Sequence, residues 1–195
     1  MTLRGVILDM DGTLTGPYFD FDGLEREVGA GDVDFVRYLS EADPAERERV
    51  QKIILRYEDD AAHNSPLNEG TREFLDWLKK HGFRLALVTR NSRRSVEIVC
   101  RRFNLRFETV WAREDGPHKP APDAIHFISR QWNILPAEIL VVGDYMYDIQ
   151  AGQSAGARTA LLTNGKPPKW QNTSDYTVAR LTDLIPILQQ SVSAK

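Results

Sequence analysis

Cysteine is nearly absent from this chain: among 195 residues there is one, Cys100. A single cysteine cannot form a disulfide within the chain, which excludes the disulfide-stapled folds of small secreted domains. The scarcity of cysteine fits a reducing compartment, and we expect a cytoplasmic protein. Cys100 lies on the apolar stripe of an expected helix and is interpreted as a core residue.

Long hydrophobic runs are also missing. The first apolar run covers Val6–Leu8 and ends at Asp9, which is too short for a secretory signal. No run reaches the roughly 20 residues that cross a membrane. A basic excess is missing as well, since 25 Lys and Arg stand against 28 Asp and Glu, whereas nucleic-acid-binding domains present a strongly basic face. We therefore expect neither a membrane nor a nucleic acid as a partner.

The chain does contain short apolar runs that alternate with helical patterns. Strands are expected at Gly5–Leu8, Arg84–Val88, Ile139–Val142 and Arg158–Leu162, with Thr109–Ala112 as a weaker fifth. These runs lack polar alternation, which is typical of parallel strands covered on both faces. The alternation of strands and helices predicts an α/β fold with a doubly wound, Rossmann-like parallel sheet. Ligands of such sheets bind at the carboxyl ends of the strands.

Helix signals fall between these runs. A helix start is favoured where a small polar side chain accepts hydrogen bonds from the free N–H groups of the first turn. Proline is also favoured there, because it has no N–H group that needs a partner. The expected starts are, in order, Asn68, Ser92, Pro120–Pro122, the residues after Asp144, and Thr182. Gly82 and Gly156 are expected to end two of these helices, because glycine adopts the left-handed conformation at a helix end.

One segment, residues 15–66, contains no buried-strand run. Two amphipathic helices are expected there instead, one over about Val33–Leu39 and one that starts at Asp43. The second has a proline in its first turn and a glutamate three residues after the cap, a capping-box pattern. We interpret the segment as a small α-helical cap inserted after the first strand. The core domain would then comprise residues 1–14 and 67–195.

Acidic pairs follow the first and the fourth expected strands. Asp9 and Asp11 are one residue apart, so strand alternation gives their side chains a similar heading, and two such carboxylates repel each other unless a cation lies between them. Asp144 and Asp148 begin a helix four residues apart and offer the hard oxygen ligands that suit Mg²⁺. Each pair also has a structural reading: a solvated Asp-Gly turn is the alternative for the first, and helix capping is the alternative for the second.

A hydroxyl and a lysine complete the pattern. Thr89 ends the second strand, before Arg90 and Asn91, at a helix start whose free N–H groups can bind an anion. Lys119 lies beside prolines that fix the backbone, and it can reach a phosphate as a point charge. Taken alone, these are a helix cap and a surface lysine. Together, at one edge of the sheet, the four groups predict a site for a phosphate and a metal.

Four motifs carry a resemblance to a known family. DMDGTLT, VTRN, HKPAPD and VVGDYMYD occur in this order, and with them the chain resembles the haloacid dehalogenase-like hydrolase superfamily, most closely its phosphoglycolate phosphatase-like branch. The resemblance covers the whole chain. It implies a Mg²⁺-dependent phosphatase that hydrolyses a phosphate monoester through an aspartyl-phosphate. The expected partner is a small phosphorylated substrate, namely phosphoglycolate, a sugar phosphate or a nucleotide.

The resemblance also implies roles for the acidic residues and the lysine. Asp9 would be the nucleophile, and Asp11 would be the general acid for the leaving oxygen and then the base for water. Asp9, the backbone carbonyl of Asp11, and Asp144 would bind Mg²⁺. Asp148 would support the metal site and Lys119, and Lys119 would bind the phosphate and neutralise its developing charge.

Around these groups, Thr89 would bind the phosphate together with Arg90 and Asn91, and Thr13 would orient the nucleophile loop. Two positions depart from the family pattern. Tyr145 stands where a small residue such as Ser is common and is expected to shape the pocket. Arg90 stands where a small or amide residue is frequent.

For two groups of residues near these motifs, two interpretations remain open. Arg90, together with Arg93 and Arg94, either draws anionic substrates to the site or forms an ordinary solvated basic face. Three aromatic residues follow the nucleophile loop and either line the substrate pocket or anchor the hinge of the cap. They are Tyr18, Phe19 and Phe21.

Three other functions share part of this residue pattern. Asp11 argues against a dehalogenase, which lacks this second acid. A sugar-phosphate mutase of the same superfamily would also use Asp9 and Asp11, but mutases carry a larger cap. The short cap predicts an open site that admits bulkier phosphate esters. A receiver-like domain that accepts a phosphoryl group without turnover is disfavoured, because its phosphorylated Asp lies on a middle strand rather than on the first.

Overall fold

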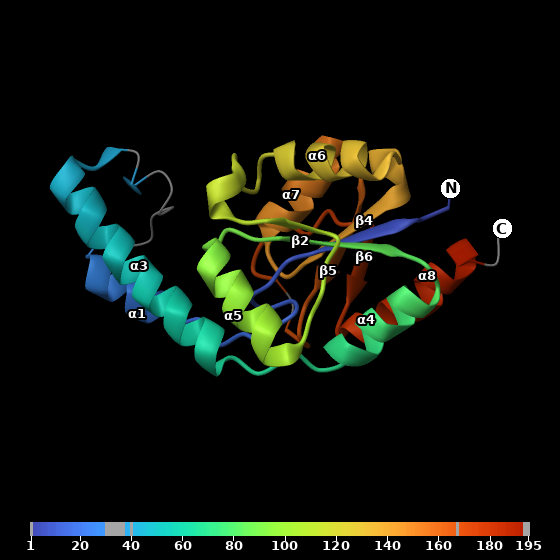
Figure 1. Ribbon diagram of the computed structural model, residues 1–195, viewed down its shortest axis with the longest axis horizontal. Helices are drawn as coiled ribbons and strands as arrows, with labels where there is room; N and C mark the ends of the chain where they lie inside the picture. The colour runs from blue at the N-terminus through green and yellow to red at the C-terminus, as the bar shows by residue number, and fades with distance from the viewer. Residues whose placement is uncertain (1, 30–37, 40, 167, 193–195) are drawn as a thin grey trace.

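The computed structural model describes residues 2–29, 38–39, 41–166 and 168–192. Its centre is a six-stranded sheet with the order β3-β2-β1-β4-β5-β6, in which every neighbouring pair is parallel (Figure 1). The strands are β1 (Gly5–Leu8), β2 (Arg84–Val88), β3 (Thr109–Trp111), β4 (Ile139–Gly143), β5 (Arg158–Leu162) and β6 (Tyr176–Val178). The predicted α/β class with a doubly wound parallel sheet is therefore confirmed.

Helices cover both faces of the sheet. On one face lie α6 (Asp123–Trp132) and α7 (Met146–Ala155), and on the other lie α4 (Thr71–Lys80), α5 (Arg93–Phe103) and α8 (Ile185–Val192) (Figure 1). In β1, Ile7 belongs to the apolar cluster under the first pair, whereas Val6 and Leu8 belong to the cluster under the other three. Both faces of a central strand are thus buried, which is why its sequence shows no polar alternation.

Two predicted helix starts are wrong. Asn68 does not cap α4, which begins at Thr71 after Gly70 and has no side-chain cap. Its side chain instead donates to backbone carbonyls of the loop after β1. Thr182 lies inside a 3₁₀ turn, Leu181–Leu184, and α8 begins only at Ile185. The cap of α5 is confirmed, because the hydroxyl of Ser92 accepts from the backbone N–H of Ser95.

Two helices, α1 (Phe21–Val28) and α3 (Pro44–Asn64), extend away from the sheet (Figure 1). They pack on each other through Leu24, Val28 and Val50. Asp43 caps α3 as predicted and accepts from two backbone N–H groups. Helix α1 was not predicted, and the predicted helix over Val33–Leu39 lies almost entirely outside the described residues.

The end of α3 nearest the sheet is fastened to the core by a buried carboxylate. Glu58 is 3% exposed and accepts from the backbone N–H of Ser92 at 3.2 Å. Both of its oxygens also accept from the guanidinium of Arg113. In addition, Arg102 donates to the carbonyls of Ala62 and Ser65. These contacts join α3 to the segments that follow β2 and β3.

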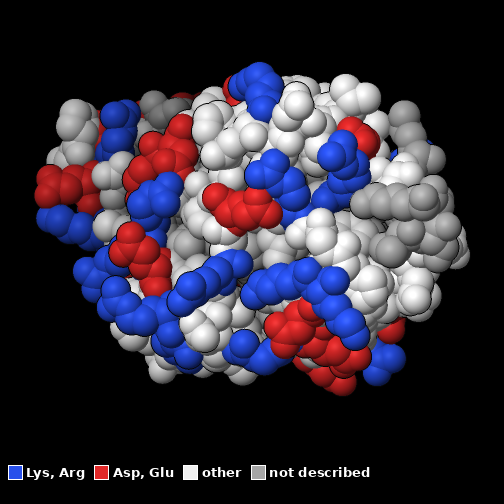
Figure 2. Space-filling model, turned by 45° about the vertical axis from the view of Figure 1, so that its right-hand side comes forward, with Lys and Arg blue, Asp and Glu red and all other residues white. Residues whose placement is uncertain are grey.

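Figure 2 shows basic and acidic side chains interspersed over one face of the molecule. Exposed ion pairs recur in the chain, such as Arg84 with Glu108 at 2.6 Å and Arg158 with Asp175 at 2.6 Å. Exposed pairs of this kind contribute only about 0.2–1 kcal/mol each, so the fold depends mainly on its two apolar layers. Within the described ranges, every helix is too short or too polar to cross a membrane.

Candidate active site

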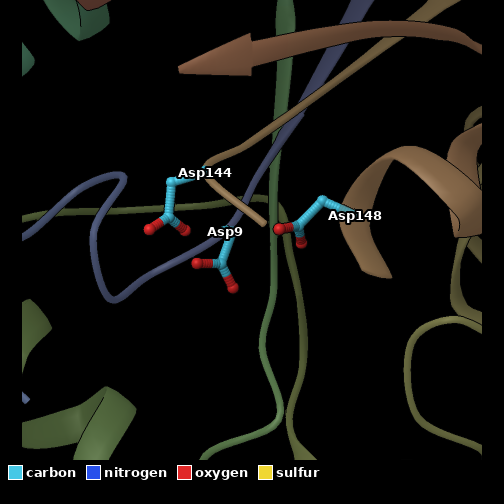
Figure 3. A group of neighbouring side chains, drawn as sticks. All are labelled: Asp9, Asp144 and Asp148. Carbon is cyan, nitrogen blue, oxygen red and sulfur yellow. The ribbon is translucent and has the colours of Figure 1, made fainter. Parts of the chain in front are cut away.

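Three carboxylates gather at the carboxyl edge of the sheet. Asp9 follows β1, Asp144 follows β4, and Asp148 lies in the first turn of α7. Because β1 and β4 are neighbours, with Leu8 opposite Val142, the two strands deliver their acids to the same place. One carboxylate oxygen from each residue lies within 4.8 Å of the others, and Figure 3 shows the three groups together. The structure thus brings together acids that are up to 139 residues apart in the chain, the difference between positions 9 and 148.

Lys119 reaches the same cluster from the segment before α6. Its ammonium group donates to Asp9 and Asp148 at 2.5 Å each and to the carbonyl of Val88 at 2.9 Å. The residue is 7% exposed, so it is not an ordinary surface lysine. Burial lowers the pKa of Lys119, but the charges of Asp148 and Asp9 outweigh it and raise that pKa above its usual value. The ammonium group of Lys119 therefore keeps its positive charge beside these carboxylates.

Two acids of this cluster, Asp9 and Asp144, are hard to ionise without a further cation. Burial raises the pKa of Asp9 to about 7; Lys119 opposes the shift and Asp148 adds to it. Burial and then repulsion from Asp9 raise the pKa of Asp144 to about 8. A divalent cation among these oxygens would remove the repulsion.

The donor set also fits Mg²⁺. It consists of carboxylate oxygens, the ligands that Mg²⁺ prefers, and the loop beneath leaves room for them. Gly12 has φ +74°, and a Cβ there would lie 2.0 Å from a carboxylate oxygen of Asp144. Only glycine permits this approach. The carbonyl of Asp11 as a third ligand stays a prediction.

Binding of Mg²⁺ is expected to stabilise the protein more at pH 8 than at pH 5. Without metal, the folded pKa values of about 7 and about 8 exceed the ordinary 3.8. The folded state then binds more protons than the unfolded state between about pH 4 and pH 8, and its stability falls as pH rises through that window. Mg²⁺ binds the ionised forms and restores the loss, by about 2.7 kcal/mol at 100 times Kd.

Thermal unfolding with Mg²⁺ or with a chelator, at both pH values, measures this effect. Asp144→Asn is the control, since it should lose most of the Mg²⁺ response. An equal Mg²⁺ response at pH 5 and pH 8 would contradict the assignment of the metal site.

Asp11 is held apart from this cluster. Its carboxylate accepts from the side-chain amide of Asn91 at 2.6 Å and from the hydroxyl of Thr15 at 3.2 Å. Burial raises the pKa of Asp11, although both hydrogen bonds oppose the shift. A buried carboxyl with a raised pKa retains a proton more readily, as a general acid must. Asn91 was predicted to bind phosphate; the structure shows it on Asp11, and phosphate binding by Asn91 stays a prediction.

Two asparagines that the sequence did not assign to the site support the nucleophile loop. Asn68 donates to the carbonyls of Gly12 and Thr13 at 3.1 and 3.2 Å, and Asn164 donates to the carbonyl of Gly12 at 2.8 Å. The two side chains also bond to each other. By contrast, the hydroxyl of Thr13 is buried without a partner among the described residues. An orienting role for Thr13 stays a prediction.

The segment after β2 lies beside the cluster. Thr89 is 4% exposed, and its hydroxyl accepts from the backbone N–H of Asn91 at 3.2 Å. The guanidinium of Arg90 lies 4.9 Å from the ring centre of Tyr147. Arg93 and Arg94 pair with the acids Asp115 and Asp59. These two pairs favour the reading of Arg93 and Arg94 as an ordinary solvated face, while phosphate binding by Thr89 and Arg90 stays a prediction.

Tyr145, the residue after Asp144, is 49% exposed. Its ring meets Tyr147 edge-on at 5.1 Å and Trp170 at 6.5 Å between centroids. The three rings form an aromatic cluster that begins at the residue after Asp144. The large residue at this position, where a small one was expected, thus joins an aromatic cluster. A role of Tyr145 in shaping the pocket stays a prediction.

Fold and site together define an α/β enzyme that gathers carboxylates and a lysine at one edge of a parallel sheet, with a helical segment inserted after the first strand. The chain belongs to the haloacid dehalogenase-like hydrolase family, since the model of that family matches residues 19–162. The family predicted from the sequence is therefore confirmed.

Similar proteins extend this result. A haloacid dehalogenase-like hydrolase domain-containing protein of Arabidopsis thaliana is 34% identical over 173 residues, covering 82% of this chain and 71% of that protein. An N-acetylmuramic acid 6-phosphate phosphatase of Pseudomonas putida is 30% identical over 190 residues, covering 85% of each. A solved structure, a predicted phosphoglycolate phosphatase of Haemophilus somnus, shares the fold with a TM-score of 0.77 at 22% identity, covering 96% of this chain and 98% of that one. The named phosphatase among the relatives supports the prediction of a phosphatase.

Proposed function

We propose that this chain is a Mg²⁺-dependent phosphatase that hydrolyses a small phosphate monoester through an aspartyl-phosphate at Asp9. One observation carries the proposal: two nearby carboxyl groups have different partners. Asp9 contacts the ammonium of Lys119 and can share a metal with Asp144. Asp11 instead accepts hydrogen bonds from the neutral donors Asn91 and Thr15 and has a pKa raised by burial. Carboxyl groups whose environments differ in this way are suited to a nucleophile and an acid.

In the first half-reaction, an oxygen of Asp9 attacks phosphorus, the bond from phosphorus to the leaving oxygen breaks, and Asp11 gives that oxygen a proton. In the second, Asp11 takes a proton from water as the water attacks phosphorus, the bond to Asp9 breaks, and phosphate leaves. Asp9, Asp144 and the carbonyl of Asp11 would hold Mg²⁺, which neutralises phosphate charge when bound. General acid–base help of this kind is worth about 10²- to 10⁴-fold in rate.

The remaining side chains position these groups. Lys119 would neutralise charge on the transferring phosphoryl group, and Asp148, which accepts from Lys119, would fix its direction. Thr89 would bind a phosphate oxygen, with Arg90 and Asn91 beside it. Phosphoryl transfer depends on such positioning and charge neutralisation more than on further covalent chemistry.

Residues 15–66 would act as a cap over this site. Its helix α3 reaches the core through the contacts of Glu58 with Ser92, after β2, and Arg113, after β3, and α1 packs on α3. The substrate would be a small phosphorylated metabolite, and the relative from Pseudomonas putida, named for a phosphorylated sugar acid, supports a substrate of about that size.

Phosphate release from p-nitrophenyl phosphate and a panel of sugar phosphates, nucleotides and phosphoglycolate tests the proposal. We expect steady release with Mg²⁺ and none after chelation, with recovery when Mg²⁺ is restored. Interconversion of sugar phosphates without net phosphate would indicate a mutase instead. A phosphorylated protein that persists without steady release would indicate a receiver-like domain.

A further inference from the structure

A cavity of about 310 Å³ opens between the chain that leads into α1 and the helix α3. Its lining is Tyr18, Phe19 and Asp20 from the first wall, and Tyr57, Asp60 and Ala61 from the second. Tyr18 and Phe19, for which a pocket role and a hinge role were both left open, line this cavity, and their role stays a prediction; the side chain of Phe21 is not among those described. The volume suits a group about the size of a sugar.

Both segments that line the cavity are close in sequence to residues that contact Asp11 or its neighbours. On the first, Thr15 contacts Asp11 through its hydroxyl, and Tyr18 follows three residues later, at most about 10 Å along the chain. On the second, Glu58 lies next to the lining residue Tyr57 and accepts from the segment whose Asn91 also holds Asp11. The two segments that line the cavity are thus adjacent in sequence to residues that contact Asp11 or the segment that holds it.

Among the described residues, the lining of the cavity contains two acids, Asp20 and Asp60, and no basic side chain. Asp20 and Asp60 each accept one hydrogen bond within the described part of the chain, from Gly23 and Asn64, which leaves an oxygen on each for a ligand. Two arginines beside the second wall are paired with acids. Arg56, the residue before Tyr57, pairs with Glu27, and Arg94 of α5 pairs with Asp59 of α3.

We propose that this cavity binds the leaving group of the substrate and selects one that carries hydroxyl or ammonium groups over one that carries a carboxylate or a second phosphate. The inference rests on the proposed function. Carboxylate and phenol oxygens accept hydrogen bonds from hydroxyls and ammonium groups, and the aromatic rings pack on apolar faces or attract a cation. A second anion would face like charge, with no basic side chain in the described part of the lining. Among the predicted substrates, sugar phosphates are thus favoured over phosphoglycolate.

Matched pairs of esters test this selectivity. Phosphoethanolamine and phosphoglycolate have the same two-carbon length but end in an ammonium group and a carboxylate. Glucosamine 6-phosphate and 6-phosphogluconate provide a six-carbon pair. We expect kcat/KM to be at least tenfold higher for the ammonium-bearing member of each pair. The kcat/KM of glucose 6-phosphate should lie between the values for the two six-carbon esters.

Substitutions at the cavity test whether the negative charge of its lining causes the preference. Asp60→Lys is expected to reduce or reverse the preference, and Asp60→Asn to weaken it. The matched control is Asp59→Asn, the preceding residue of α3, which pairs with Arg94 and does not line the cavity. This control should keep the parent preference. Circular dichroism and thermal unfolding verify that each variant is folded.

The outcomes are distinct. Equal or faster hydrolysis of the carboxylate-bearing esters by the parent protein would overturn the selectivity while leaving the phosphatase intact. So would an unchanged preference in a folded Asp60→Lys variant. No phosphate release from any ester, p-nitrophenyl phosphate included, would overturn the proposed function, and the selectivity with it.

Discussion

Asp9→Asn is expected to lower kcat for phosphate release by about 10⁴-fold or more, because an amide oxygen cannot replace the carboxylate that attacks phosphorus. The substitution keeps the size and shape of the side chain. It removes a buried charge that repels Asp144, so the folded variant should be no less stable than the parent protein in the absence of metal at pH 8. Steady-state phosphate release and thermal unfolding measure the two effects.

A matched control is available in Asp123→Asn. Asp123 is an exposed residue at the start of α6, outside the site, and the same exchange there should leave kcat unchanged. An Asp9→Asn protein that retains kcat within about tenfold of the parent would remove Asp9 from the chemistry, because losing a nucleophile costs far more than that.

Lys119→Met is expected to reduce both activity and stability strongly. The substitution removes the partner of Asp9 and Asp148 and leaves two buried carboxylates without a counter-charge. Breaking a buried pair in this way costs about 3–5 kcal/mol. Urea unfolding in the presence of a chelator at pH 8 should show a loss of this order, and phosphate release should be lost even when Mg²⁺ is in excess.

The double variant Lys119→Met/Asp148→Asn separates the structural role of the lysine from its proposed role on the phosphate. Removing one stranded charge should recover part of the lost stability, while activity stays lost. The exposed Lys79 of α4 provides a control, since Lys79→Met should change neither property. Recovery of activity together with stability in the double variant would show that Lys119 acts only by holding the fold.

Local patterns were enough to predict much of the fold. The runs at Gly5–Leu8, Arg84–Val88 and Arg158–Leu162 became strands with those bounds, because strands buried on both faces must be apolar throughout. Strand β6 was missed because only three residues form it, at the edge of the sheet, and just one of them, Val178, is buried. So short an edge strand carries too weak a pattern to be distinguished from a loop.

The candidate site was predictable as a set of positions, since parallel strands bring their carboxyl ends to one edge. Its contacts were less accessible. Lys119 read as a surface lysine when taken alone, because lysine is seldom buried without a partner, and its partners lie 110 and 29 residues away. Asn68 read as a helix cap for a similar reason: the carbonyls that it binds belong to a loop 56 and 55 residues earlier. Side-chain partners so distant in sequence leave no local pattern.

The central claim is that Asp9 carries the phosphoryl group during turnover, and chemical trapping tests it most directly. An acyl phosphate is reduced by borohydride to an alcohol, so a reaction quenched during turnover with a good substrate and Mg²⁺ should yield a peptide with homoserine in place of Asp9. The modified peptide should be absent without substrate and in Asp9→Asn. Rapid phosphate release with no reduced residue at position 9, or with the label on another side chain, would contradict the mechanism.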